Sequence, residues 1–312
     1  MNWDLDVDMV CTGSGPAGLA TAISAVDFGG DVFVAASPAD GPAGGAGVPV
    51  SVGAGRLHSW LGSRVLDPET TDYFVALSSD LGPFGHGASD IDVPICVVHE
   101  TPAGPGRAVA PFFGAELREW AARCLASPYG YLHTRVSDWR TTTLHTADGE
   151  TIEVAEIGSM RPDPDNVGAS VLDWLGAQAR DRSIEVQPDC ALQRIVFEDG
   201  EATGAVFSTP DGELAIRTRH GVTIATGSPQ LSGETPDMPS AAGDSTLRVC
   251  LVGRHASRFG RVELLTSEPV ARDGLSACRP VNRQLHVSLR ETRVHSPTWR
   301  CGSVDGYPSL GQ

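Results

Sequence analysis

A glycine-rich turn near the N-terminus most constrains what this chain can fold into. The stretch VCTGSGPAGLATA, residues 10–22, carries Gly13, Gly15 and Gly18 in the spacing G-x-G-x-x-G. In such a turn the first glycine permits a tight bend, the second lets a pyrophosphate approach the backbone, and the third lets a helix pack closely on a strand. The pattern predicts a dinucleotide-binding turn where a strand precedes it and a helix follows. The alternative is a tight turn with a purely structural role.

The flanking residues supply that context. Residues 6–12 read as a short buried strand, residues 16–28 as a helix, and residues 31–36 as a second strand. The N–H groups and the positive dipole end of the helix would then face the phosphates. We therefore predict an α/β fold that begins with a Rossmann-like βαβ unit of a parallel sheet.

The end of the second strand lacks a residue that many dinucleotide sites carry there. An acid at this position binds the ribose hydroxyls in NAD sites, and a nearby arginine binds the 2′-phosphate in NADP sites. In this chain Ala36 stands at that position, and the first arginine after it is Arg56. Ser37 offers a weaker hydroxyl contact, and Asp40 could fold back. The strand end therefore fits neither a simple NAD site nor a simple NADP site.

Charge excludes several functions. All 23 basic residues of the 312 are arginine, so no lysine is present to form a Schiff base or to bind a nucleoside triphosphate. The net charge of −16 argues against general binding of nucleic acid. Residues 1–245 carry −21 and residues 246–312 carry +5. The basic tail is either a solvated face that docks on an acidic body or a distinct interaction segment.

The expected compartment is the cytoplasm. The N-terminal residues MNWDLDVDMV are acidic and lack the basic region of a secretory signal. No apolar run reaches the roughly 18 residues of a membrane span. The seven cysteines are scattered and include no C-x-x-C pair, so we expect neither a disulfide framework nor a metal site.

A second informative block covers residues 168–227. It reads as a helix, the short strand SIEVQ, and four strand-like runs within CALQRIVFEDGEATGAVFSTPDGELAIRTRHGVTIATG. Elsewhere the pattern predicts helices at 67–81 and 111–125, a hairpin at 144–157, a Pro/Ser/Gly linker after 228, and the tail strands LRVCLVG, RVELLT and QLHVSL.

The glycine turn and the second block together resemble the superfamily of FAD-dependent fumarate reductase and succinate dehydrogenase flavoproteins and 3-ketosteroid Δ1-dehydrogenases. LDPETTDYFVAL also resembles a segment of the ketosteroid branch. The family's C-terminal FAD block has no counterpart in residues 228–312. The resemblance implies FAD as the cofactor. The residues that it places at the cofactor are Gly13, Ser14, Gly15, Pro16, Ala17, Gly18, Ala36, Ser37, Gly44, Gly45, Ala191, Ala225, Thr226 and Gly227.

The resemblance also implies how the chain is divided. Residues 1–85 and 166–228 would form the two parts of an FAD-binding domain, and residues 86–165 would form an inserted mixed α+β substrate segment. Residues 229–245 would be a linker, and residues 246–312 a short β-rich, basic C-terminal tail.

The expected function is that of a dehydrogenase or reductase. It would move a hydride between the flavin and an activated C–C bond of a small substrate, either steroid-like or a carboxylate, with a protein as a further electron-transfer partner. The alternative is a non-catalytic flavoprotein-like scaffold that uses its basic tail for protein interaction. No catalytic residue is assigned. His58 and His133 are candidate proton donors or ordinary structural histidines, and arginines 107, 118, 123 and 135 are candidates to bind a carboxylate or simple surface groups.

Overall fold

The computed structural model describes residues 1–37, 65, 67–78, 81, 93–99, 114–135, 141–225 and 245–267. All of them belong to one compact unit, Met1–Arg279. The predicted site residues Gly44, Gly45, Thr226 and Gly227, the residues of the linker before 245, His58 and the predicted strand QLHVSL lie outside the described residues.

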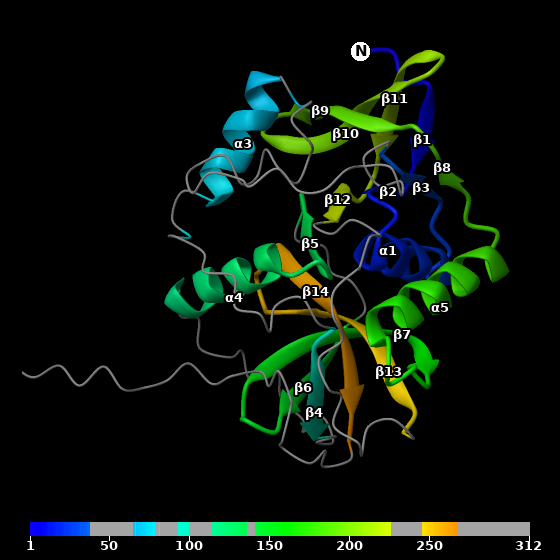
Figure 1. Cartoon of the computed structure of the whole chain (residues 1–312). Coiled ribbons are helices and arrows are strands. Elements are labelled where there is room, and N and C mark those ends of the chain that lie inside the picture. The colour runs from blue at the N-terminus through cyan, green and yellow to red at the C-terminus, as the bar shows by residue number, and fades with distance from the viewer. Residues whose placement is uncertain are drawn as a thin grey trace, which may run out of the picture. The chain divides into compact units, whose positions relative to one another are not determined.

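Two β-sheets and the helices on them make up the described chain (Figure 1). The helices are α1 (Pro16–Asp27), α3 (Pro68–Ser78), α4 (Gly114–Ala126) and α5 (Val167–Asp181). The smaller sheet has the order β1 (Leu5–Val7), β11 (Gly212–Thr218), β10 (Glu201–Thr209) and β9 (Ala191–Glu198). The larger sheet has the order β13 (Leu247–Gly253), β7 (Thr151–Met160), β6 (Thr142–Thr146), β4 (Ile95–His99), β14 (Phe259–Thr266), β5 (Gly130–His133), β12 (Val222–Ala225), β2 (Met9–Thr12), β3 (Val32–Ala35) and β8 (Val186–Gln187).

One end of the larger sheet is parallel. β12, β2, β3 and β8 run in the same direction, with Thr12 opposite Ala35 and Ala35 opposite Gln187. β2 is buried along its whole length, as expected of a parallel strand that is covered on both faces. α1 packs on these strands and against α5 (Figure 1). The carboxyl ends of the four strands therefore meet at one edge, where the glycine turn begins.

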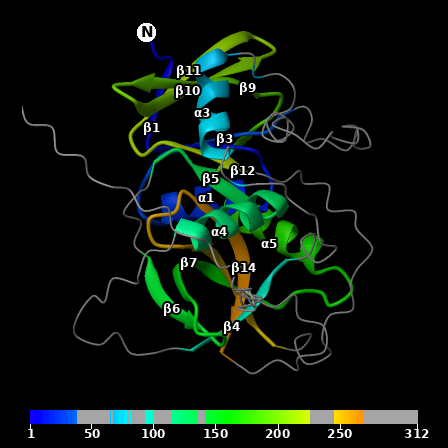
Figure 2. The same ribbon diagram turned by 90° about the vertical axis from the view of Figure 1, so that its left-hand side faces the viewer.

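The other end of the larger sheet closes on itself. β13 pairs with β7, β7 with β6, β6 with β4, β4 with β14, and β14 again with β13. These strands form a closed ring, and β14 also joins the ring to β5. Side chains of the ring share one core cluster with Trp120 and Cys124 of α4, the helix that lies along β14 (Figure 2).

Most of the elements predicted from the sequence are present. The helices at α1, α3, α4 and α5, the hairpin of β6 and β7, and the four runs that become β9, β10, β11 and β12 are confirmed with small shifts of their ends. Asp67 caps the start of α3, because its carboxylate accepts the N–H of Thr70 at 2.8 Å. The tail strands LRVCLVG and RVELLT are β13 and part of β14.

The prediction of one strand over residues 6–12 is wrong. The segment is split at Asp8 into β1, which pairs with β11 in the smaller sheet, and β2, which pairs with β12 and β3 in the larger one. The Asp8 carboxylate accepts the N–H of Asp31 at 2.9 Å and forms an ion pair with Arg219 at 2.7 Å. These contacts hold the chain where it passes from one sheet to the other, and the guanidinium of Arg219 lowers the pKa of Asp8.

Candidate functional site

The glycine turn joins β2 to α1 at the parallel edge of the larger sheet. Gly13 has φ +99°, a conformation that side-chain-bearing residues rarely adopt, and an added Cβ would lie 3.0 Å from the Cβ of Ala225. A Cβ added to Gly18 would lie 1.9 Å from the carbonyl oxygen of Gly13. The fold itself therefore requires glycine at positions 13 and 18.

Gly15 is different, because its backbone does not require glycine. It is the N-cap of α1 with φ −72° and ψ −178°, which any residue can adopt. Among the described residues no side chain caps the helix, Pro16 follows directly, and the first turn contains no acid. The N–H groups of that turn and the positive helix end are thus left for an external anion, and a glycine here leaves room for one to approach. This arrangement fits the pyrophosphate of a dinucleotide.

Strand ends from distant parts of the sequence surround the turn. The N–H of Gly13 donates to the carbonyl of Ala35 at 2.8 Å, which ties the turn to the end of β3. Ala225 ends β12 beside Gly13. The next residue of the β3 strand, Ala36, is hydrogen-bonded to the segment that follows β8, with Ala36 N to Gln187 O at 2.8 Å.

The structure thus brings together most of the site residues that the sequence resemblance implies. The residues of the turn (Gly13, Ser14, Gly15, Pro16, Ala17 and Gly18), the end of β3 (Ala36 and Ser37) and the end of β12 (Ala225) lie at the parallel edge. Ala191 begins β9 directly after Cys190, whose N–H donates to the carbonyl of Ala36 at 3.0 Å.

His133 does not fit the proton-donor role considered for it. Its Nδ1 lies 2.7 Å from the Thr223 hydroxyl, and its ring packs against Tyr131 at a centroid distance of 4.5 Å. Removal from water lowers the pKa of the imidazole to about 4, because the charged form loses its hydration. At neutral pH the ring is therefore uncharged and carries no proton that it can readily give up as an acid.

The candidate arginines have separate partners. Arg118 is exposed on α4. Arg135 forms an ion pair with Glu201 at 2.9 Å and also donates to the carbonyl of Arg219. Arg123 lies over the Trp120 ring at 5.5 Å. The described members of the group therefore do not share one binding point, and arginine 107 lies outside the described residues.

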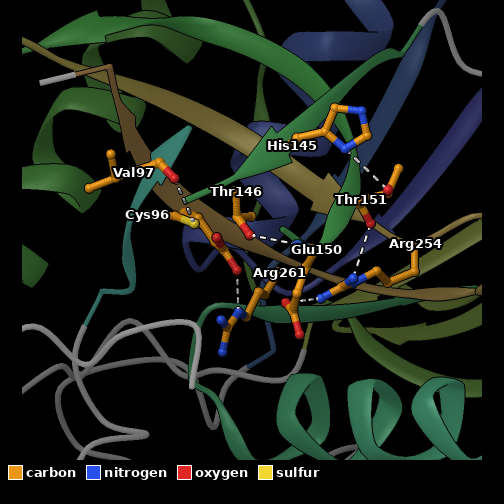
Figure 3. A network of polar contacts seen from close by, with 9 residues as sticks. Cys96, Val97, His145, Thr146, Glu150, Thr151, Arg254 and Arg261 are labelled. Carbon is orange, nitrogen blue, oxygen red and sulfur yellow. Dashed lines mark hydrogen bonds and ion pairs between the residues drawn. The ribbon is translucent and has the colours of Figure 1, made fainter. Parts of the chain in front are cut away.

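Sequence reasoning missed a buried charged cluster where α4 meets the closed ring. Arg254 and Arg261 lie over the same Trp120 ring at 5.1 and 5.3 Å. Arg261 forms an ion pair with Glu263 at 2.6 Å, in which the side chains are 9% and 1% exposed. Arg254 forms an ion pair with Glu150 and donates to the backbone carbonyl of Thr151, as Figure 3 shows. Each cation has an anion or an aromatic face beside it, so the cluster is accounted for as packing of α4 on the ring.

Two absences apply to the described residues only. No group of three or more His, Cys, Asp or Glu side chains is placed to hold a metal ion in the described part of the chain. None of the described helices is both long enough and apolar enough to cross a bilayer.

A family model and several solved structures are similar to this chain. Residues 110–253 match the family described as FAD binding domain. The match includes Ala191 and Ala225 and starts after the glycine turn. No curated protein matches the chain.

The similar structures are distant. One is a 3-ketosteroid-Δ4-(5α)-dehydrogenase from Rhodococcus jostii RHA1, in complex with 4-androstene-3,17-dione, at 20% identity over 71% of this chain and 46% of that chain, with a TM-score of 0.29. A flavocytochrome c3 fumarate reductase in an open conformation is 16% identical over 71% and 33%, with a TM-score of 0.30. Sdh1 of Mycobacterium smegmatis in complex with UQ1 is 13% identical over 68% and 32%, with a TM-score of 0.26.

This chain spans less than half the length of each of these solved chains. At such TM-scores the similarities carry no argument about activity. The match to the FAD binding domain includes the second sequence block and agrees with the cofactor that the resemblance implies. The match of residues 110–253 to an FAD binding domain indicates FAD as the cofactor.

Proposed function

We propose that the protein is an FAD-dependent oxidoreductase that moves a hydride between the flavin and an activated C–C bond of a small or steroid-like substrate. The observation that carries the proposal is the backbone of Gly15: it does not need glycine, yet it stands at an uncapped helix end. In this proposal β2, α1 and β3, with β12 and β8, form a Rossmann-like domain whose parallel strand ends meet at the cofactor.

The residues present have defined parts in holding the cofactor. The N–H groups of the first turn of α1 would bind the pyrophosphate, and Gly13 and Ala225 would keep the turn in shape behind it. Ala36, which follows β3, and Ala191, which begins β9, would lie on the adenosine side. The flavin, when bound, supplies the redox chemistry, while the protein supplies position and electrostatics.

A flavin titration with two glycine variants tests the cofactor site. We expect the wild-type protein to bind FAD and quench its fluorescence, and Gly15→Val to lose binding because the side chain occupies the path of the pyrophosphate. Gly114→Val is the matched control: Gly114 begins α4, and a Cβ added there meets no atom within 4 Å. Circular dichroism should show both variants folded. Retention of FAD by Gly15→Val at the wild-type level would place the phosphates elsewhere.

The spectrum of the bound flavin then tests turnover. A steroid or carboxylate substrate that bleaches the visible flavin band without oxygen, followed by recovery with an electron acceptor, would support the oxidoreductase. A flavin that stays bound and is neither reduced nor reoxidised by any such pair would support the non-catalytic scaffold instead.

A further inference from the structure

A turn that follows β8 lies beside the position where the predicted ribose-binding acid is missing. Ala36 donates its N–H to the carbonyl of Gln187 and accepts the N–H of Cys190 at 3.0 Å. A regular parallel ladder would join Ala36 to two residues that are two positions apart, but these are three apart. Pro188 and Asp189 form the turn between these two residues, beside Ala36.

Asp189 lies in this turn without any structural use of its charge. Its φ is +55°, in the left-handed region that aspartate and asparagine tolerate better than other side chains. It is exposed, and its carboxylate has no hydrogen bond or ion pair with any residue in the described ranges. Glycine or asparagine would satisfy the backbone equally well, so the negative charge is what remains to be explained.

We infer that Asp189 supplies the carboxylate that binds the ribose hydroxyls of the adenosine half of FAD, in place of the acid that Ala36 lacks. The inference rests on the proposed function. Hydroxyl groups that donate to a carboxylate form charge-assisted hydrogen bonds, which are stronger than neutral ones. Asp189 immediately precedes Cys190, whose N–H donates to the carbonyl of Ala36, and it lies two residues before Ala191. The turn therefore brings a negative charge to the strand ends at which a ribose is expected.

Replacing Asp189 with asparagine tests the inference, with FAD as the probe. Asp189→Asn keeps a residue suited to positive φ and removes only the charge. We expect the dissociation constant for FAD, measured by quenching of flavin fluorescence, to rise about tenfold or more. Adding Ala36→Glu to this variant should restore most of the affinity, because it returns a carboxylate to the end of β3.

Glu185→Gln is the matched control. Glu185 is an exposed carboxylate on the same segment, and its side chain already lies 3.5 Å from the Gln187 amide. This variant should bind FAD as the wild type does, and all variants should unfold at the same temperature without FAD. Wild-type affinity in Asp189→Asn, or an equal loss in Glu185→Gln, overturns the inference while the proposed function stands. A wild-type protein that binds no FAD overturns both.

Discussion

Three glycines share one motif, and different physical demands select them. Gly13 needs a positive φ, Gly18 needs the absence of a Cβ beside the carbonyl of Gly13, and Gly15 has a backbone conformation that any residue can adopt. The first two demands come from the fold, and the third is left for a ligand. The motif can be recognised in the sequence because these requirements act within a few residues. Only the structure shows which of its glycines the fold requires and which one is left for a ligand.

The pH dependence of stability should report the burial of His133. Its pKa is about 4 in the folded protein and 6.5 in the unfolded reference. Between these values the unfolded chain binds the proton and the folded one does not, so stability falls as pH falls through this window. We expect the contribution of His133 to be about 2 kcal/mol smaller at about pH 5 than at about pH 7.5.

Urea unfolding of His133→Asn at the two pH values measures this contribution. The asparagine amide can keep a hydrogen bond to Thr223 but does not titrate, so the variant should lose less stability on acidification than the wild type. His145→Asn is the control, because His145 is exposed on β6. An identical pH dependence in wild type and His133→Asn would show that the ring is hydrated in the folded state.

At the scale of elements, local sequence predicted helices well and strand partners poorly. The period of apolar residues and the cap at Asp67 are local signals. The predicted helix at 67–81 therefore lies close to the observed bounds of α3, Pro68–Ser78. Strand pairing depends on residues far apart in the chain. The sequence did not predict that residues 6–12 divide between two sheets, because the alternation of apolar residues does not say which strand pairs with which.

We expect Thr70 to stabilise the packing of α3 on the smaller sheet. It is fully buried, its hydroxyl donates to the Asp67 carboxylate at 2.7 Å, and it accepts the N–H of Ile195 of β9 at 2.9 Å. Thr70→Val keeps the shape but leaves that buried N–H without a partner, which costs about 1–3 kcal/mol of unfolding free energy.

Chemical denaturation of Thr70→Val beside Asp72→Ala checks this prediction. Asp72 is exposed on the same helix and should change stability by no more than about 0.5 kcal/mol. Equal stability of Thr70→Val and the wild type would show that water or a backbone shift satisfies the Ile195 amide.

At the scale of the whole molecule, the segment expected to be a separate tail contributes to the core. β14 is buried at every position and pairs with β4, β5 and β13, and β13 pairs with β7. Its charged residues Arg261 and Glu263 are buried together. The count of arginines in the tail suggested a solvated or interacting surface, and only the pairing of strands shows where these particular charges lie.

Truncation should separate the two parts of this tail. Removal of residues 246–312 deletes β13 and β14, opens the ring and exposes its core, so we expect loss of cooperative thermal unfolding by circular dichroism. A chain that ends at Arg279 retains the whole of the unit Met1–Arg279 and should unfold cooperatively. Cooperative unfolding of the shorter chain would mean that the remaining strands fold without closure of the ring.

By itself, the sequence determined the glycine turn, the helices, the runs of β-strand and the resemblance to FAD-dependent flavoproteins, because these depend on spacing within short segments. It also showed that Ala36 leaves the strand end without an acid. Only the tertiary structure decided which strand lies beside that end, and with it the turn that brings Asp189 beside Ala36. The physical reason is that a parallel neighbour is joined by backbone hydrogen bonds between residues some 150 positions apart, which no local pattern encodes.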